Sequence, residues 1–183
     1  MNDRLQYKRK VYKETDIAYL AGIIDGEGSI YIGNFSCNPI TKLPYYQTNI
    51  QVTNTDKNLI DWLQQIFGGL VNKRTKQQMP KNSRKQAYTW TISGERLTHL
   101  CELILPYLIC KRRQAEIMIT MRATYTKNGA QRGHQGVQSL PDEIRLLRQS
   151  LMEEMRSLHI RTHSYKHNGH LPRVAMPQLL EEV

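Results

Sequence analysis

The chain is expected to be an α+β protein in which helices alternate with pairs of antiparallel strands, in the order α-β-β-α-β-β-α. Helical segments are indicated by apolar residues recurring at i, i+3, i+4 and i+7, and strands by apolar and polar residues that alternate. At 183 residues, the chain is long enough for one domain with a substantial core. Further helices are expected after the seventh element.

The two periodicities divide the chain into nine elements. The expected helices span residues 16–26, 56–67, 95–105, 110–125 and 141–158, and the expected strands span residues 29–37, 45–54, 70–76 and 86–93. Asp16 or Thr15 is the expected N-cap of the first helix, and Thr55 that of the second. A single domain over residues 16–159 is therefore expected, with a basic arm at 1–15 and a basic tail at 160–183.

The end of the first helix carries an unusual pair of carboxylates. Asp25 and Glu27 stand where basic residues are favoured, because the C-terminal end of a helix carries partial negative charge. A carboxylate beside exposed backbone carbonyls suits a hard cation such as Mg²⁺. On the same helix, Ala18, Gly22 and Gly26 form a stripe of small residues, which is typical of two helices in close contact.

The charge pattern indicates a polyanionic partner. The net charge is +10 and the isoelectric point about 9.6, and no Asp or Glu occurs in residues 28–55, 62–94 or 117–141. Such segregation favours nucleic acid. No run of 18 apolar residues indicates a membrane span. Three widely spaced cysteines without a CxxC pair indicate reduced thiols in a reducing intracellular compartment.

One face of the expected sheet carries side chains suited to reading bases. Glutamine and asparagine can pair with adenine, and arginine and lysine with guanine, in the DNA major groove. A curved antiparallel ribbon fits that groove. The expected DNA-binding residues are Tyr31, Gln47, Asn49, Gln51, Asn72, Arg74, Lys76 and Thr89.

The nine residues from Leu20 to Gly28 resemble the LAGLIDADG motif of homing endonucleases. Six positions match the family name letter for letter: Leu20, Ala21, Gly22, Ile24, Asp25 and Gly28. The resemblance implies a saddle-shaped four-stranded sheet over the DNA major groove. Because the motif occurs once, it also implies a homodimer, with Ala18, Ala21, Gly22 and Asp25 at the dimer interface.

The resemblance also implies site residues. Glu27 matches the metal-binding catalytic acid, and the Gly26 carbonyl would be a second metal ligand. Asn54 matches a water-positioning residue, whereas Asn58 stands where relatives carry a basic residue. Lys111 matches the site lysine, and Arg113 is placed to assist it. Asp25 is expected to have a structural role in capping and helix packing.

The expected function is therefore metal-dependent, site-specific double-strand cleavage of DNA at a long, near-palindromic target. Mg²⁺ is the expected cofactor, with Mn²⁺ as a substitute, and the protein would be an intron-encoded homing endonuclease. The alternatives are a maturase of the same fold that binds intron RNA and a DNA-binding protein that does not cleave. The retained Glu27 and Lys111 favour the enzyme.

Overall fold

The computed structural model describes residues 10–37, 44–79, 81, 85–125 and 141–159, and it confirms the α+β architecture. In chain order the elements are α1 (Glu14–Glu27), β1 (Gly28–Cys37), β2 (Pro44–Asn54), α2 (Lys57–Phe67), β3 (Leu70–Lys73), η2 (Lys76–Gln78), β4 (Tyr88–Ser93), α3 (Glu95–Ile104), η3 (Leu105–Tyr107), α4 (Arg112–Ala123) and α5 (Asp142–His159). Residues 1–9 of the expected arm and the whole tail at 160–183 lie outside the described residues. None of the described helices is long and apolar enough to span a membrane.

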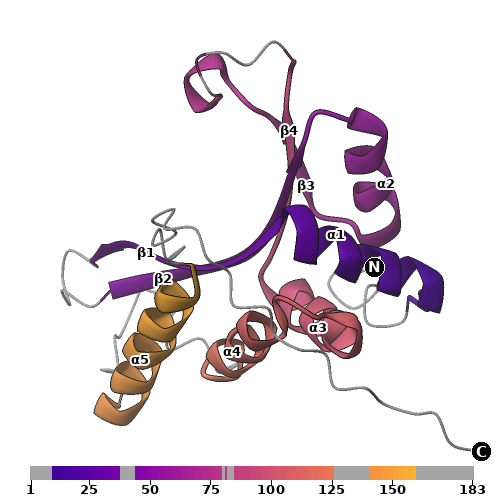
Figure 1. Ribbon diagram of the computed structural model, residues 1–183. Coiled ribbons are helices and arrows are strands. Elements are labelled where there is room, and N and C mark those ends of the chain that lie inside the picture. The colour runs from indigo at the N-terminus through magenta and orange to yellow at the C-terminus, as the bar shows by residue number, and fades with distance from the viewer. Residues whose placement is uncertain (1–9, 38–43, 80, 82–84, 126–140, 160–183) are drawn as a thin grey trace, which may run out of the picture.

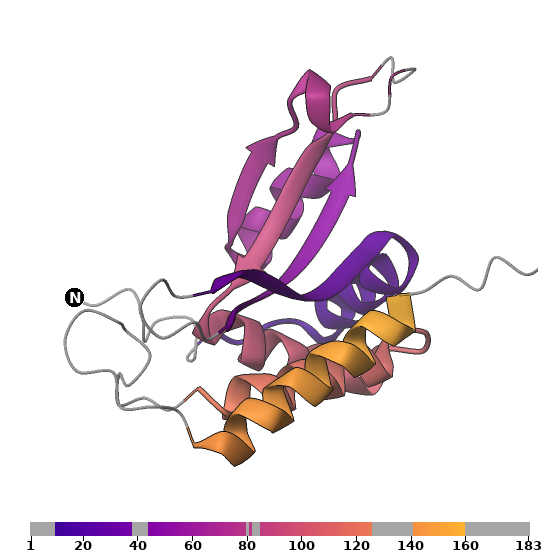
Figure 2. The same ribbon diagram turned by 90° about the vertical axis from the view of Figure 1, so that its left-hand side faces the viewer.

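The four strands form one antiparallel sheet in the order β1-β2-β4-β3. The register places Ile50 between Ile30 and Ile92, and Val52 opposite Trp90. Because paired residues share a face, these side chains form one continuous apolar layer, and all of them are buried. Figure 1 shows the helices gathered on this side of the curved sheet, and Figure 2 looks onto the other side, with α2 behind the strands.

Helix α1 begins two residues earlier than expected. The carbonyl of Lys13 accepts hydrogen bonds from the backbone N–H groups of Asp16 and Ile17, at 3.0 and 3.2 Å. The predicted N-cap, Asp16 or Thr15, is therefore wrong. Glu14 and Asp16 instead occupy the first turn, where the helix dipole favours acids.

The chain passes from α1 to β1 without a loop. The N–H of Gly28 donates to the carbonyls of Ile23 and Ile24. A Cβ at Gly28 would lie 2.7 Å from the Cα of Ile24, so only glycine allows the strand to leave the helix this closely. Glu27, the last residue of α1, is thereby held directly beside the start of the sheet.

Other element boundaries also differ from expectation. Asp56 rather than Thr55 caps α2, because its side chain accepts the N–H of Asn58 at 2.8 Å. Strand β3 ends at Lys73 instead of residue 76. The reason is a 3₁₀ turn, in which the backbone N–H of Thr75 donates to Gln78 Oε1 at 3.0 Å. Helix α4 begins at Arg112, with Lys111 at its N-cap.

Helix α5 is fixed to the rest of the domain by an arginine. Arg148 is buried and donates to Thr124 twice, from Nε to Oγ1 at 2.8 Å and from a terminal nitrogen to the carbonyl at 2.7 Å. Its guanidinium also lies 4.4 Å from the ring centroid of Tyr125. Burial lowers the pKa of Arg148, which measures the cost of withdrawing this cation from water.

Candidate active site and open sheet face

Glu27 lies at the junction of α1 and β1, with its side chain exposed. Asn54, the last residue of β2, donates from Nδ2 to Oε2 of Glu27. The Oδ1 atom of Asn54 accepts the backbone N–H of Asp56 at 2.8 Å. Because Oδ1 is used in this way, the NH₂ end of the amide must face Glu27, and it orients the carboxylate. The structure thus brings together two of the predicted site residues.

Asp25 turns in the other direction, towards the start of α4. Its Oδ2 accepts the backbone N–H of Ile109 at 2.7 Å, and its Oδ1 accepts that of Lys111 at 2.9 Å. The ammonium of Lys111 donates to the carbonyl of Asp25 at 2.5 Å. The last turn of α1 contains no basic residue. Lys111 therefore brings from α4 the positive charge that a helix C-terminus favours, and both carboxylate oxygens of Asp25 are used within the chain.

The backbone carbonyl and carboxylate oxygens at this junction are the ligand types that a hard divalent cation prefers. Gly26 is exposed and lies in the last turn of α1, where backbone carbonyls have no partner within the helix. The carboxylate of Glu27 follows it directly. In the part of the chain that the structure describes, however, no group of three or more His, Cys, Asp or Glu residues could hold a metal. One carboxylate with a backbone carbonyl still suits Mg²⁺, which is usually held by one or two carboxylates and takes its other oxygens from water and substrate phosphates.

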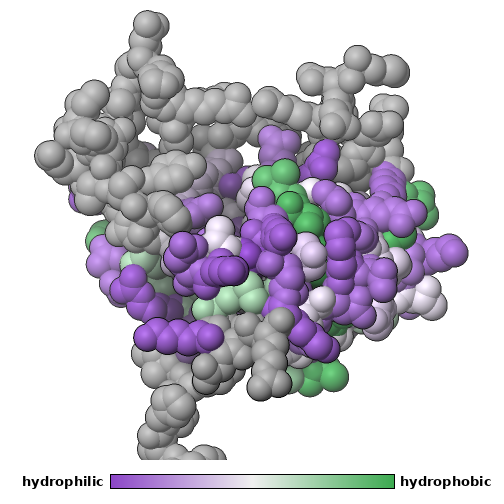
Figure 3. Space-filling model, turned by 90° about the horizontal axis from the view of Figure 1, so that it is seen from above, coloured by the Kyte–Doolittle hydropathy of each residue, from purple (hydrophilic) through white to green (hydrophobic). Residues whose placement is uncertain are grey.

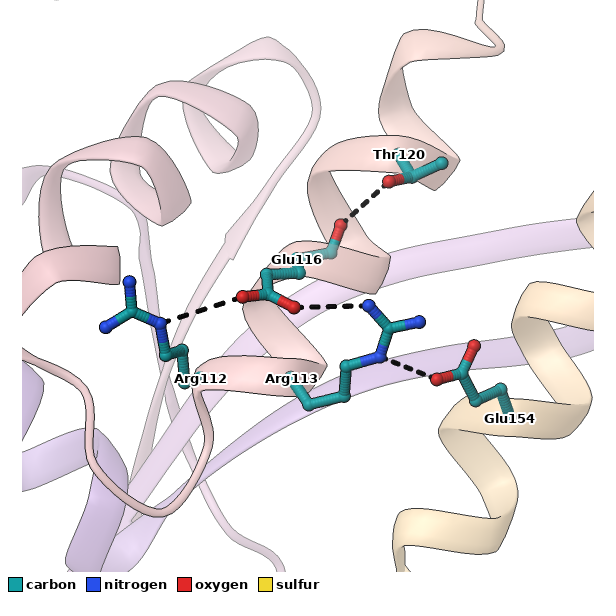
Figure 4. A network of polar contacts seen from close by, with 5 residues as sticks. All are labelled: Arg112, Arg113, Glu116, Thr120 and Glu154. Carbon is teal, nitrogen blue, oxygen red and sulfur yellow. Dashed lines mark hydrogen bonds and ion pairs between the residues drawn. The ribbon is translucent and has the colours of Figure 1, made fainter.

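The other two predicted site positions carry no available positive charge. Asn58 is exposed and neutral, and its backbone N–H serves the cap of α2. Arg113 donates from Nε to Glu154 at 2.7 Å and from a terminal nitrogen to Glu116 at 3.1 Å (Figure 4). These two hydrogen bonds raise the pKa of Arg113. Arg113 therefore links α4 to α5 and is neutralised by two carboxylates.

The exposed side of α1 carries the small-residue stripe. Ala18, Gly22 and Gly26 are all exposed, and a Cβ built on either glycine would meet nothing within 4 Å. Ala21, by contrast, is 0% exposed and belongs to the hydrophobic core of its own chain. Its predicted place in the dimer interface is therefore wrong, because a side chain that is fully buried in its own chain has no surface to offer a partner.

The uncovered face of the sheet is polar and free of carboxylates, since none of the four strands contains Asp or Glu. Figure 3 shows a mainly hydrophilic surface with small, separate hydrophobic patches. Cross-strand pairing places Tyr31, Asn49 and Ser93 in one row, Ser29, Gln51, Thr91 and Leu70 in a second, and Thr53, Thr89 and Asn72 in a third. Of the predicted DNA-binding residues on the strands, Gln51, Asn72 and Tyr31 are exposed, and Gln47 and Thr89 are half-buried.

Three of the predicted DNA-binding residues are placed differently from expectation. Lys76 lies in η2, beyond the end of β3, so it is not on the sheet. Arg74 also follows β3, but its backbone N–H donates to the carbonyl of Ala87 at 2.9 Å and continues the ladder by one step. Asn49 is only 3% exposed, and its Oδ1 has no hydrogen-bond partner. Its position in the centre of the sheet explains this burial, because neighbours on both sides cover it.

Leu70 is a residue of this face that the sequence pattern did not single out. It is 67% exposed and lies in the same row as Gln51 and Thr91. The sequence could have indicated this position, because Leu70 lies two residues before Asn72 and residues two apart in a strand point to the same side.

Similar proteins share this architecture. One structure is described as the homing endonuclease I-CvuI in complex with the I-CreI target in the presence of 2 mM Mg, with DNA not cleaved; it is 20% identical, covers 87% of each chain and has a TM-score of 0.64. The archaeal intron-encoded homing endonuclease I-Vdi141I complexed with DNA is 12% identical over 80% of this chain and 86% of that chain, with a TM-score of 0.63. The I-SmaMI LAGLIDADG homing endonuclease bound to cleaved DNA is 15% identical over 87% of this chain and 54% of that one, with a TM-score of 0.60.

At these identities the likeness establishes the fold. No curated protein sequence matches the chain. A family model described as LAGLIDADG endonuclease matches residues 20–118, which is more than half of the 183 residues and includes both the α1 junction and the whole sheet. The chain therefore belongs to the LAGLIDADG endonuclease family.

Proposed function

We propose that this protein is a site-specific double-strand DNA endonuclease that acts as a homodimer with Mg²⁺. The observation that carries the proposal is the junction of α1 with the sheet, where Asn54 orients the exposed carboxylate of Glu27. This carboxylate lies at the edge of a sheet face that has no acids of its own. A DNA backbone can therefore approach the face without repulsion and meet one negative group, at the position where a cation would bind.

Each residue at the junction has a different role in the proposed reaction. Glu27 and the Gly26 carbonyl would hold the metal, which supplies polarisation of the scissile phosphate and a lower pKa for the attacking water. Asn54 keeps the Glu27 carboxylate in one orientation. The ammonium of Lys111, held by the Asp25 carbonyl, places positive charge beside the same helix end, where it would stabilise charge on the phosphate.

The exposed stripe of small residues on α1 supports a dimer. Two copies in contact through the Ala18, Gly22 and Gly26 stripe would bring both Glu27 carboxylates to the same end of the helix pair. Each copy would then serve one DNA strand, and the two-fold symmetry predicts a near-palindromic target.

Replacement of Glu27 by Gln tests the cleavage proposal. A partially randomised duplex library is incubated with wild type and Glu27→Gln in Mg²⁺ and in Ca²⁺, and bound and cut molecules are sequenced. Wild type should select a long, near-palindromic site and cut it in Mg²⁺, whereas Glu27→Gln should bind the same site and cut it at least 100-fold more slowly, because an oxygen ligand to the metal loses its charge. Glu143→Gln is the matched control, since Glu143 is exposed in the first turn of α5. Tight selection of a site that wild type does not cut in Mg²⁺ or Mn²⁺ would contradict the enzyme and favour a binding protein.

Replacement of Gly22 by Leu tests the dimer. Nothing lies within 4 Å of a Cβ at this position, so the isolated chain accommodates the side chain, and leucine has a better helix propensity than glycine. The folded chain should therefore stay as stable as wild type or gain up to about 1 kcal/mol, while sedimentation velocity should show wild type as a dimer and Gly22→Leu as a monomer. Equal dimerisation of both proteins would place the contact on another surface.

A further inference from the structure

We infer that Leu70 reads thymine, by contact with its 5-methyl group, in each half of the DNA target. This inference rests on the proposed function, because it requires the open sheet face to enter the major groove. Leu70 is 67% exposed although it lies in a strand, and the residues that share its row are Thr91, Gln51 and Ser29. Among the residues of this face whose side chains the structure describes, it is the large aliphatic one; the others carry amides or hydroxyls, apart from Gly33.

The position of Leu70 is held firmly by the backbone around it. Gly69, directly before it, has a φ of +95°, and a Cβ there would lie 2.7 Å from the carbonyl oxygen of Thr91. The indole Nε1 of Trp90 donates to the carbonyl of Gly68 at 2.6 Å. The start of β3 therefore packs closely against β4, and the backbone that carries Leu70 is held in place.

The chemistry of the row matches an A·T-containing step. Adenine offers N7 and N6 in the major groove to an amide such as that of Gln51, and thymine offers its methyl group to an apolar side chain. Gln51 and Leu70 stand two strands apart, which corresponds to roughly 10 Å at about 4.8 Å for each strand spacing. Side chains of this length can reach the two strands of one base pair or of two adjacent pairs. Leu70 has no polar atom, so the thymine methyl is the feature of the groove that it can recognise.

Deoxyuridine tests this contact, because it differs from thymidine only in lacking the methyl group. Each thymine of the selected target is replaced singly by uracil, in both half-sites together, and the dissociation constants of wild type, Leu70→Ala and Leu146→Ala are measured in Ca²⁺. Leu146 is a suitable control because it is 62% exposed and lies on α5 rather than on a strand of the open face. Since Leu70 is exposed, its truncation should leave the fold intact, which a thermal unfolding curve checks.

At one thymine position, uracil should weaken binding by wild type and by Leu146→Ala about fourfold for each half-site, the factor expected for burial of one methyl group. Leu70→Ala should bind the thymine and uracil duplexes equally at that position. If no uracil substitution affects wild type, or if each affects wild type and Leu70→Ala by the same factor, the inference is wrong while DNA recognition stands. Failure to select any duplex would instead overturn the proposed function on which the inference rests.

Discussion

The two faces of the sheet are made from the same strands but differ in almost every physical property. On the helix-covered face, Ile50 and Trp90 are buried in the core, whereas one residue away Gln51 and Thr91 face outwards. A slip of one residue in the register would exchange the two sets. Alternate residues of the same strands are therefore buried in the core or exposed on the open face. Under the proposed function the exposed ones contact DNA, so most substitutions should affect either stability or DNA binding and spare the other.

The largest expected difference between the faces comes from truncating Trp90. This side chain is 0% exposed, and its Nε1 donates to the carbonyl of Gly68. Trp90→Ala should lower the free energy of unfolding by about 3–5 kcal/mol, from the cavity and the lost packing. Gln51→Ala is the matched variant on the other face, and it should change stability by no more than about 0.5 kcal/mol while weakening DNA binding. Urea denaturation and DNA titration of both variants measure this separation. A stability loss from Gln51→Ala equal to that from Trp90→Ala would contradict it.

A smaller effect is expected where the two faces meet, at the motif carboxylates. Asp25 accepts two backbone N–H groups from the segment before α4, whereas Glu27 is exposed. Asp25→Ala should lower the free energy of unfolding by about 1–2 kcal/mol, because it leaves these donors without their partner. Glu27→Ala should cost at most about 0.5 kcal/mol.

Urea denaturation of both proteins, with wild type as reference, measures the difference between the two carboxylates. If Asp25→Ala is as stable as wild type, the hydrogen bonds to α4 do not hold the junction together. Under the proposed function, cleavage should fall in both variants, but for different reasons: Glu27→Ala would remove the proposed metal ligand, whereas Asp25→Ala would displace Lys111.

Much of the fold could be predicted from local sequence. The alternation in residues 45–54 and the apolar stripe of residues 16–26 each indicate an element together with its buried side, because burial of apolar surface dominates folding. The order of helices and strands then follows from the chain. Ends of elements were less predictable: caps at Lys13 and Asp56, and the 3₁₀ turn after β3, depend on hydrogen bonds among a few neighbouring groups.

The candidate site likewise has features that local sequence predicts and features that only the folded chain creates. Glu27 and Gly26 are visible as a motif, because their chemistry depends on adjacent positions in one helix end. The hydrogen bond from Asn54 to the Glu27 carboxylate, and the bond from Lys111 to the Asp25 carbonyl, join segments that lie far apart in the sequence. The prediction for Ala21 failed for a related reason, since a helical stripe can face either its own core or a partner.

By itself, the sequence determined which residues are apolar at periods of 2 and 3.6, where acids are absent, and that two carboxylates end a short helix. Those properties are local, and they determine the element types, the charge of the sheet and the family. Only the tertiary structure decided which strands are neighbours, and therefore that Gln51, Thr91 and Leu70 share one row and that Asn49 is covered. The physical reason is that cross-strand register and burial arise from contacts between residues distant in the chain, which no local pattern encodes.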